Sequence, residues 1–203
     1  MNRTTSRIET LADGVFAISM TLLVLNVTVQ TGLGHKDFLE ALRSVGPKVL
    51  AYMVSFSVIA VYWIGHHNQY FWIKHTDRTF LWINVFFLMA IAFIPFSTSL
   101  IAAYPQEVLA ILIYGANAMA AGILLLLHWN YAAGRGKLVP GHIDAHLATV
   151  TQRRITLGIV FYAVATGLSF LSPKLSVALL VLLPLFYMRS SEIDRFLKGQ
   201  HSE

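Results

Sequence analysis

Six apolar segments of this chain approach the length needed to cross a lipid bilayer. A helix crosses the hydrocarbon core with about 20 mainly apolar residues, within a usable range of about 17–25. The last segment is short and contains Pro184, so we expect it to be tilted, kinked or only partly embedded. The pattern predicts an all-α integral membrane protein with one domain over residues 1–203. The predicted spans are 12–29, 45–64, 80–103, 107–128, 155–171 and 175–188.

The composition supports a membrane protein. Charged residues make up 12% of the chain and hydrophobic residues 56%, whereas a soluble domain carries about a quarter charged residues. The chain has no cysteine, which excludes disulfides, thiolate catalysis and cysteine-based metal sites. The net charge of +5 does not indicate nucleic acid as a partner, because the basic residues lie between apolar segments rather than on one groove-binding face.

The basic residues also predict the orientation of the chain. With the N-terminus in the cytoplasm, eleven of the fifteen Lys and Arg residues fall on the cytoplasmic side and four on the outer side. This asymmetry follows the positive-inside rule and, with six spans, places both termini in the cytoplasm. A five-span chain would put the C-terminal bases outside and lose the asymmetry. The four outer bases are Lys36, Arg43, Lys48 and Lys174.

The first apolar segment carries a stripe of branched aliphatic residues. A period of 3.6 residues places Ile18, Leu22 and Leu25 on one helical face, with Thr21 beside them. Periodicity alone favours a packing face, because apolar residues at helical spacing usually pack against other helices. A stripe flanked by hydroxyls is also suited to lining a pore. The spacing by itself leaves both interpretations open.

Two charged residues precede this stripe. Ser6 and Glu9 form a capping-box pattern, which predicts a helix start near Arg7. Asp13 lies on roughly the opposite side from Ile18, and its six-residue separation from Arg7 is a poor pairing distance on one helix. Both charges are therefore expected either to face the interface or to find partners on another helix. Candidate partners at the end of the second span are Trp63, His66 and His67.

The start of the first span resembles a family signature. The pattern Arg-x-x-x-Phe-Ser-Asp is typical of the transmembrane protein 175 family of potassium channels, and Arg7 and Asp13 stand at its two ends. Leu11 and Ala12 replace its Phe-Ser pair, which removes an aromatic ring and a hydroxyl. The Trp63-x-x-His66-His67 pattern, the length and the six-span count also resemble the family. The likeness covers nearly the whole chain, with its specificity in about twenty residues.

This resemblance implies an architecture and an activity. Prokaryotic members are similar to one half of the animal channel, which contains two six-span repeats. They are homotetramers in the plasma membrane, with four copies of the first span around a central pore. The resemblance thus implies a potassium-preferring cation channel, with further copies of the chain, lipid and potassium ions as its partners. An enzyme activity and a cofactor are not expected.

The resemblance also implies roles for individual residues. Ile18 matches the family's hydrophobic constriction, Leu22 and Leu25 match additional apolar layers, and Thr21 matches a hydroxyl layer that contributes to potassium preference in some bacterial members. Many relatives carry an acidic residue where this chain has Asn26, so we expect weaker cation attraction at the outer mouth. The implied support of the pore helix is a polar network of Arg7, Asp13, Trp63 and His66 or His67.

Such a pore differs from the common potassium-channel filter. That filter uses backbone carbonyls of a TVGYG loop, and this chain contains no such loop. A narrow aliphatic ring instead excludes water and imposes a desolvation barrier, because a bare ion in a medium of low dielectric costs tens of kcal/mol. We expect modest selectivity, since potassium releases water more readily than sodium does.

A proton-coupled secondary transporter is the first alternative. Coupling normally requires ionisable residues within the spans, and none lies between Gly14 and Val29. The third and fourth spans offer only Asn84, Asn117 and a marginal His128. Inverted repeats with broken helices are not apparent.

A histidine-ligand metalloprotein is the second alternative. His142 and His146 have the spacing that places two imidazoles on one helical face, and His66, His67 and His75 fall near one cytoplasmic loop. A metal site usually needs three or four convergent ligands, so we predict no metal site.

Small residues elsewhere in the chain predict close packing between helices. They are Ala118 and Gly122 in the fourth predicted span, and Gly158 and Gly167 in the fifth.

Overall fold

The computed structural model describes residues 5–29, 34–139 and 145–187, and every regular element in these ranges is helical. α1 spans Ser6–Leu22 and ends in a 3-10 turn, η1, over Leu23–Asn26. The short helix α2 (His35–Ser44) leads into α3 (Gly46–Trp72). The remaining elements are α4 (Arg78–Ala103), α5 (Val108–Asn130), the π-helical turn η2 (Tyr131–Arg135), α6 (Ala145–Gly167), η3 (Leu168–Phe170) and α7 (Pro173–Tyr187).

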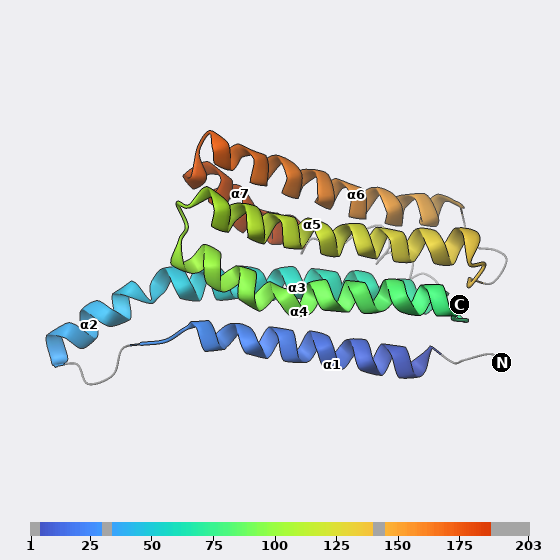
Figure 1. Cartoon of the computed structure of the whole chain (residues 1–203), viewed down its shortest axis with the longest axis horizontal. Coiled ribbons are helices and arrows are strands. Elements are labelled where there is room, and N and C mark those ends of the chain that lie inside the picture. The colour runs from blue at the N-terminus through green and yellow to red at the C-terminus, as the bar shows by residue number, and fades with distance from the viewer. Residues whose placement is uncertain (1–4, 30–33, 140–144, 188–203) are drawn as a thin grey trace, which may run out of the picture.

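The long helices form an elongated bundle with α1 on one flank (Figure 1). α1 packs against α3 and α4, α5 packs between α4 and α6, and α7 contacts α6 and α3. α2 projects beyond one end of the bundle. α1 therefore has one side on the bundle and the other side free.

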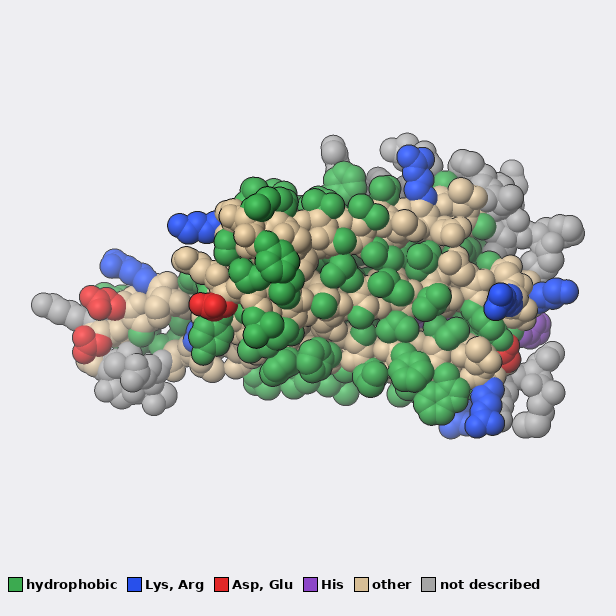
Figure 2. Space-filling model, turned by 45° about the horizontal axis from the view of Figure 1, so that its top comes forward, with side chains coloured by type: hydrophobic (Ala, Val, Ile, Leu, Met, Phe, Trp, Pro, Cys, Tyr) green, Lys and Arg blue, Asp and Glu red, His purple; other side chains and the backbone are tan. Residues whose placement is uncertain are grey.

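Four helical segments in the described part of the chain are long and apolar enough to cross a membrane. Hydrophobic side chains cover the middle of the molecule, and charged side chains gather toward its two ends (Figure 2). α6 is polar over its N-terminal part, and α7 is a shorter apolar helix. The count of six spans therefore remains a prediction. The four segments are Ser6–Asn26, Asp37–Trp72, Arg78–Ala103 and Val108–Arg135.

The helices extend beyond several of the predicted spans. α3 continues past residue 64, the predicted end of the span, to Trp72. Its last two turns bury polar and aromatic side chains, which a hydropathy scale does not count as apolar. α1 begins at Ser6, as expected, but the predicted capping box is wrong: Thr5 is the N-cap and no side chain caps the helix. α2 was not predicted, because its apolar residues occupy one stripe of a ten-residue, mainly polar helix.

The core is centred on α4 and α5, with α1 contributing one face. Phe16 of α1, Phe87 of α4 and Ile111 of α5 are fully buried in one cluster. Hydroxyl groups tie the same helices together: Thr98 Oγ1 donates to Ser55 Oγ at 2.9 Å, and Ser55 Oγ lies 3.3 Å from the hydroxyl of Tyr114. Buried hydroxyls need such partners, so these contacts fix the rotation of α3, α4 and α5 about their axes.

Candidate pore-lining face and its support

α1 has one buried face and one exposed face. The buried face consists of Ala12, Phe16, Ser19 and Leu23. The predicted stripe lies on the other side, where Ile18 is 61% exposed, Leu22 43% and Leu25 67%. A single chain therefore leaves the whole predicted stripe uncovered.

The buried face fixes which residues point outward. The ring of Phe16 packs against the rings of His66 and Phe87, at centroid distances of 5.8 and 6.0 Å. Ser19 satisfies its buried hydroxyl by donating to the carbonyl of Val15 at 2.8 Å. Because a helix advances 100° per residue, these anchors leave Ile18 on the opposite side of α1.

Thr21 shares the exposed side of α1 with Ile18. Its hydroxyl donates to the carbonyl oxygen of Ile18 at 2.8 Å. A hydroxyl carries one donor and two acceptor lone pairs, so the Thr21 oxygen keeps its acceptor capacity. The exposed oxygen of Thr21 is therefore suited to contact water or a cation.

Asp13 is joined to α3 by a side-chain hydrogen bond. Nε1 of Trp63 donates to Oδ1 of Asp13 at 2.9 Å. The ring of His67 stacks on Trp63 at 5.6 Å with an interplanar angle of 24°. Of the three candidate partners on α3, Trp63 is the one that contacts Asp13, and His67 stacks on Trp63.

Arg7 stands apart from this contact. It is exposed, and its side chain has no hydrogen bond or ion pair within the described residues. The structure of one chain therefore does not bring Arg7 together with Asp13, Trp63 or the histidines.

His66 points into the bundle rather than toward Asp13. Its Nε2–H donates to Oδ1 of Asn84 on α4 at 2.9 Å, and the imidazole stacks on Phe87 at 5.3 Å with an interplanar angle of 10°. Both His66 and Asn84 are buried. Asn84 is a partner that sequence reasoning missed. The sequence feature that could have identified Asn84 is its polar amide within a mainly apolar predicted span.

A second buried imidazole lies next to the first. Nδ1–H of His128 on α5 donates to Oε1 of Gln69 on α3 at 2.7 Å, and Gln69 Nε2 donates to the carbonyl of Leu125 at 3.2 Å. The rings of His66 and His128 are 5.4 Å apart. Together the two imidazoles link α3, α4 and α5 directly behind the end of α1 that carries Asp13.

The C-terminal end of the first helical segment is also tied to the bundle. The side-chain amide of Asn26 donates to the carbonyl of Pro95 on α4 at 3.2 Å. Asn26 closes η1, so Leu25 is presented by a 3-10 turn rather than by the α-helix. The side chain of Asn26 therefore takes part in helix packing, and it follows directly after Leu25 at the C-terminal end of the stripe.

The described residues contain no group of three or more His, Asp or Glu side chains that would hold a metal ion. His66 and His67 are directed toward different partners, Asn84 and Trp63. His142 lies outside the described residues, and so does the side chain of His146.

Sequence matches place the chain among known proteins. A profile of the family described as "Endosomal/lysosomal potassium channel TMEM175" matches residues 7–95. A protein of Streptomyces collinus named as a potassium channel is 34% identical over 185 residues, covering 89% of this chain and 90% of that protein. A protein of Chamaesiphon minutus, also named as a potassium channel, is 35% identical over 191 residues, covering 90% of this chain and 93% of that protein.

A solved structure agrees with these matches. The crystal structure described as a lysosomal potassium-selective channel TMEM175 homolog from Chamaesiphon minutus superposes with a TM-score of 0.78 at 34% identity. The superposition covers 90% of this chain and 95% of that chain. The profile match contains both the exposed stripe of α1 and the Asp13–Trp63 contact. On sequence, coverage and fold, this chain belongs to the TMEM175 family.

Proposed function

We propose that copies of this chain assemble into a potassium channel, as four subunits with α1 of each lining one central pore. The channel resides in a prokaryotic plasma membrane. The relatives named as potassium channels cover nearly the whole chain, which supports this activity and argues against an enzyme. The tetramer and the pore-lining role of α1 are our inference from the exposed face of that helix.

The uncovered face of α1 is the observation that carries the proposal. Lipid alone would accept Ile18, Leu22 and Leu25, but it would leave the acceptor lone pairs of the exposed Thr21 oxygen without a partner. Polar groups in hydrocarbon are costly without a partner or water. A water-containing pore accommodates both the apolar layers and the Thr21 oxygen on one helix face.

Ile18 supplies the constriction in this account. A ring of four isoleucine side chains excludes water when it is narrow, and desolvation then blocks the ion without a charged plug. Leu22 and Leu25 add further apolar layers toward the outer side. Widening of the rings lets partly hydrated cations pass.

Thr21 favours potassium at the next layer. Its hydroxyl hydrogen is engaged by the carbonyl of Ile18, so the oxygen lone pairs face the ion path. Four such oxygens replace part of the hydration shell, and potassium gives up its water at lower cost than sodium. We expect modest selectivity, because one hydroxyl layer supplies fewer ligands than a carbonyl filter.

The experiment is potassium flux into liposomes that contain the purified full-length protein. Ile18→Asn places a polar group at the constriction and is expected to increase the flux and reduce the preference for potassium over sodium. The matched control is Val164→Asn, because Val164 on α6 is similarly exposed, at 57%, but lies away from α1. An equal response of the two variants would refute the assignment of Ile18.

The same assay separates the channel from a proton-coupled transporter. A channel carries potassium down its own gradient with no proton gradient present. Flux that appears only when a proton gradient is imposed, with fixed stoichiometry, would favour the transporter instead.

A further inference from the structure

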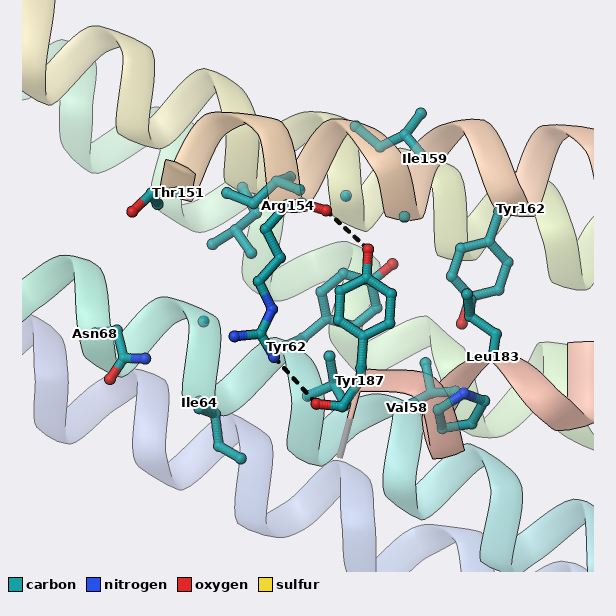
Figure 3. A pocket seen from close by; sticks show the side chains of 17 residues that line it. Val58, Tyr62, Ile64, Asn68, Thr151, Arg154, Ile159, Tyr162, Leu183 and Tyr187 are labelled. Carbon is teal, nitrogen blue, oxygen red and sulfur yellow. Dashed lines mark hydrogen bonds between the residues drawn. The ribbon is translucent and has the colours of Figure 1, made fainter. Parts of the chain in front are cut away.

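A cavity lies between α3, α5, α6 and α7, on the side of α3 away from α1 (Figure 3). Its volume is about 110 Å³, and it is partly open to the surroundings. An engineered apolar cavity of about 150 Å³ holds a benzene molecule, so this one admits part of a hydrocarbon chain. Lining residues include Val61, Ile64, Gly65, Ile155, Ile159 and Leu183.

One charged residue lines this apolar cavity. Nη2 of Arg154 donates to the carbonyl of Tyr187 at 3.0 Å, and the guanidinium carbon lies 5.5 Å from the centroid of the Tyr187 ring. The Tyr187 hydroxyl in turn donates to the carbonyl of Arg154 at 2.7 Å. In the described part of the chain no carboxylate pairs with Arg154. A guanidinium has five N–H donors, and most of those of Arg154 have no partner within residues 5–29, 34–139 and 145–187.

With α6 as the predicted fifth span and the N-terminus in the cytoplasm, Arg154 lies toward the cytoplasmic face of the hydrocarbon. At 1.5 Å per residue, Arg154 is about 20 Å from Gly167 at the opposite end of α6, and the hydrocarbon core is about 30 Å thick. A cation at this depth is costly unless it is paired or reaches the interface. The site therefore calls for an anion with an apolar tail.

We propose that this cavity binds an anionic phospholipid of the cytoplasmic leaflet. The phosphate receives N–H donors of Arg154, which matches the forked geometry that guanidinium groups offer to phosphate. One acyl chain enters the cavity beside Val61 and Ile155. The lipid fills the space between α3 and α6 next to the end of α7.

The glycines of the cavity wall fit this role. A Cβ at Gly158 would lie 2.7 Å from the hydroxyl of Tyr187, so only glycine lets Tyr187 reach the Arg154 carbonyl. Gly65 lines the cavity on α3. Gly65 and Gly158 thus leave the cavity open beside Arg154.

The test is native mass spectrometry of the purified full-length protein with phosphatidylglycerol or phosphatidylcholine carrying the same acyl chains. We expect the wild type to retain phosphatidylglycerol about fivefold more than phosphatidylcholine, the preference that one arginine near the surface provides. Arg154→Gln should abolish the preference. Arg153→Gln is the matched control, because Arg153 is exposed and does not line the cavity; it should behave as wild type.

A second variant leaves the arginine in place. Val61→Trp fills the cavity from α3 and should also abolish retention of phosphatidylglycerol, which separates the acyl-chain site from simple charge attraction. It keeps the test decisive if Arg154→Gln does not fold.

Three results would overturn the proposal. They are equal retention of the two lipids by the wild type, unchanged retention in Val61→Trp, and equal losses in the Arg153 and Arg154 variants. The first is also the result expected if residues 188–203 of the chain itself, or a second copy, occupy the cavity.

Discussion

The indole Nε1 of Trp63 donates to Oδ1 of Asp13 at 2.9 Å and thereby joins α3 to α1 one turn and a half before Ile18. This is a direct contact between the exposed side of α1 and a neighbouring helix. It leaves the stripe itself uncovered while limiting how α1 can rotate. Any rotation that turns Ile18 inward must break this bond.

Trp63→Phe tests the contact between these two residues. The change removes the N–H donor and retains an aromatic ring, so we expect a loss of about 1 kcal/mol of stability, the net worth of one hydrogen bond, and altered potassium flux. Trp72→Phe is the control, because Trp72 lies on the same helix and has no side-chain hydrogen bond among the described residues. Thermal unfolding in detergent and liposome flux measure the two effects. Identical behaviour of the two variants would show that the Asp13 contact does not position α1.

Asn84→Leu tests the buried partner of His66. The substitution leaves Nε2–H of His66 unpaired in the core, which costs about 1–3 kcal/mol. Asn130→Leu at the exposed end of α5 should change stability by less than about 0.5 kcal/mol. The double variant His66→Phe with Asn84→Leu should recover much of the loss, because removing both partners leaves no unpaired group. A double variant that is less stable than Asn84→Leu would contradict this account.

Thr21→Val tests the hydroxyl layer. Valine keeps the shape but removes the oxygen, so we expect the potassium-to-sodium permeability ratio to fall by a factor of about 2–10, the range of one hydrogen bond's net worth. Thr21→Ser should retain the ratio. Thr10→Val is the control, because the Thr10 hydroxyl makes the same type of bond, to the Ser6 carbonyl at 2.9 Å, but precedes the stripe. Reversal potentials under bi-ionic conditions give the ratio, and an unchanged ratio in Thr21→Val would remove Thr21 from the ion path.

Asn26→Asp tests the outer end of α1. The change removes the donor to the Pro95 carbonyl and sets a carboxylate against that carbonyl, so the side chain should turn toward the outer mouth. We expect a higher potassium conductance at low ionic strength and little difference at high salt, because salt screens exposed charges. Asn26→Leu also loses the bond but carries no charge. A salt-independent change common to both variants would assign Asn26 a packing role only.

Apolar length predicted the placement of α1, α3, α4 and α5, because each buries a long hydrophobic run. Their ends were less predictable. α3 runs on to Trp72 through His66 and Gln69, whose burial depends on Asn84 and His128 in other helices. Hydropathy scores such residues as polar, so it ends the span too early.

The sequence narrowed the partner of Asp13 to three candidates. It did not predict which of the three makes the contact. Trp63, His66 and His67 lie within two turns of one helix, and only the rotation of α3 decides that Trp63 meets Asp13 while His66 turns to Asn84. The small-residue pattern was similarly partial. Gly122 and Gly158 do face close neighbours, whereas Gly167 has open space.

Among the described glycines, the one with the closest neighbour is a glycine that the pattern did not single out. A Cβ at Gly115 of α5 would overlap the side chain of Thr166 on α6. Gly115 belongs to no small-residue repeat that sequence reasoning had marked. Close approach of this kind depends on the crossing point of two helices, which a single sequence does not reveal.

The most direct test of the central claim is cysteine accessibility along α1. The chain contains no native cysteine, so a single Ile18→Cys substitution gives one reactive thiol without background. We predict that a charged, water-soluble methanethiosulfonate reagent blocks potassium flux through Ile18→Cys and leaves Val164→Cys unaffected. Block of neither variant, or equal block of both, would contradict a pore lined by α1.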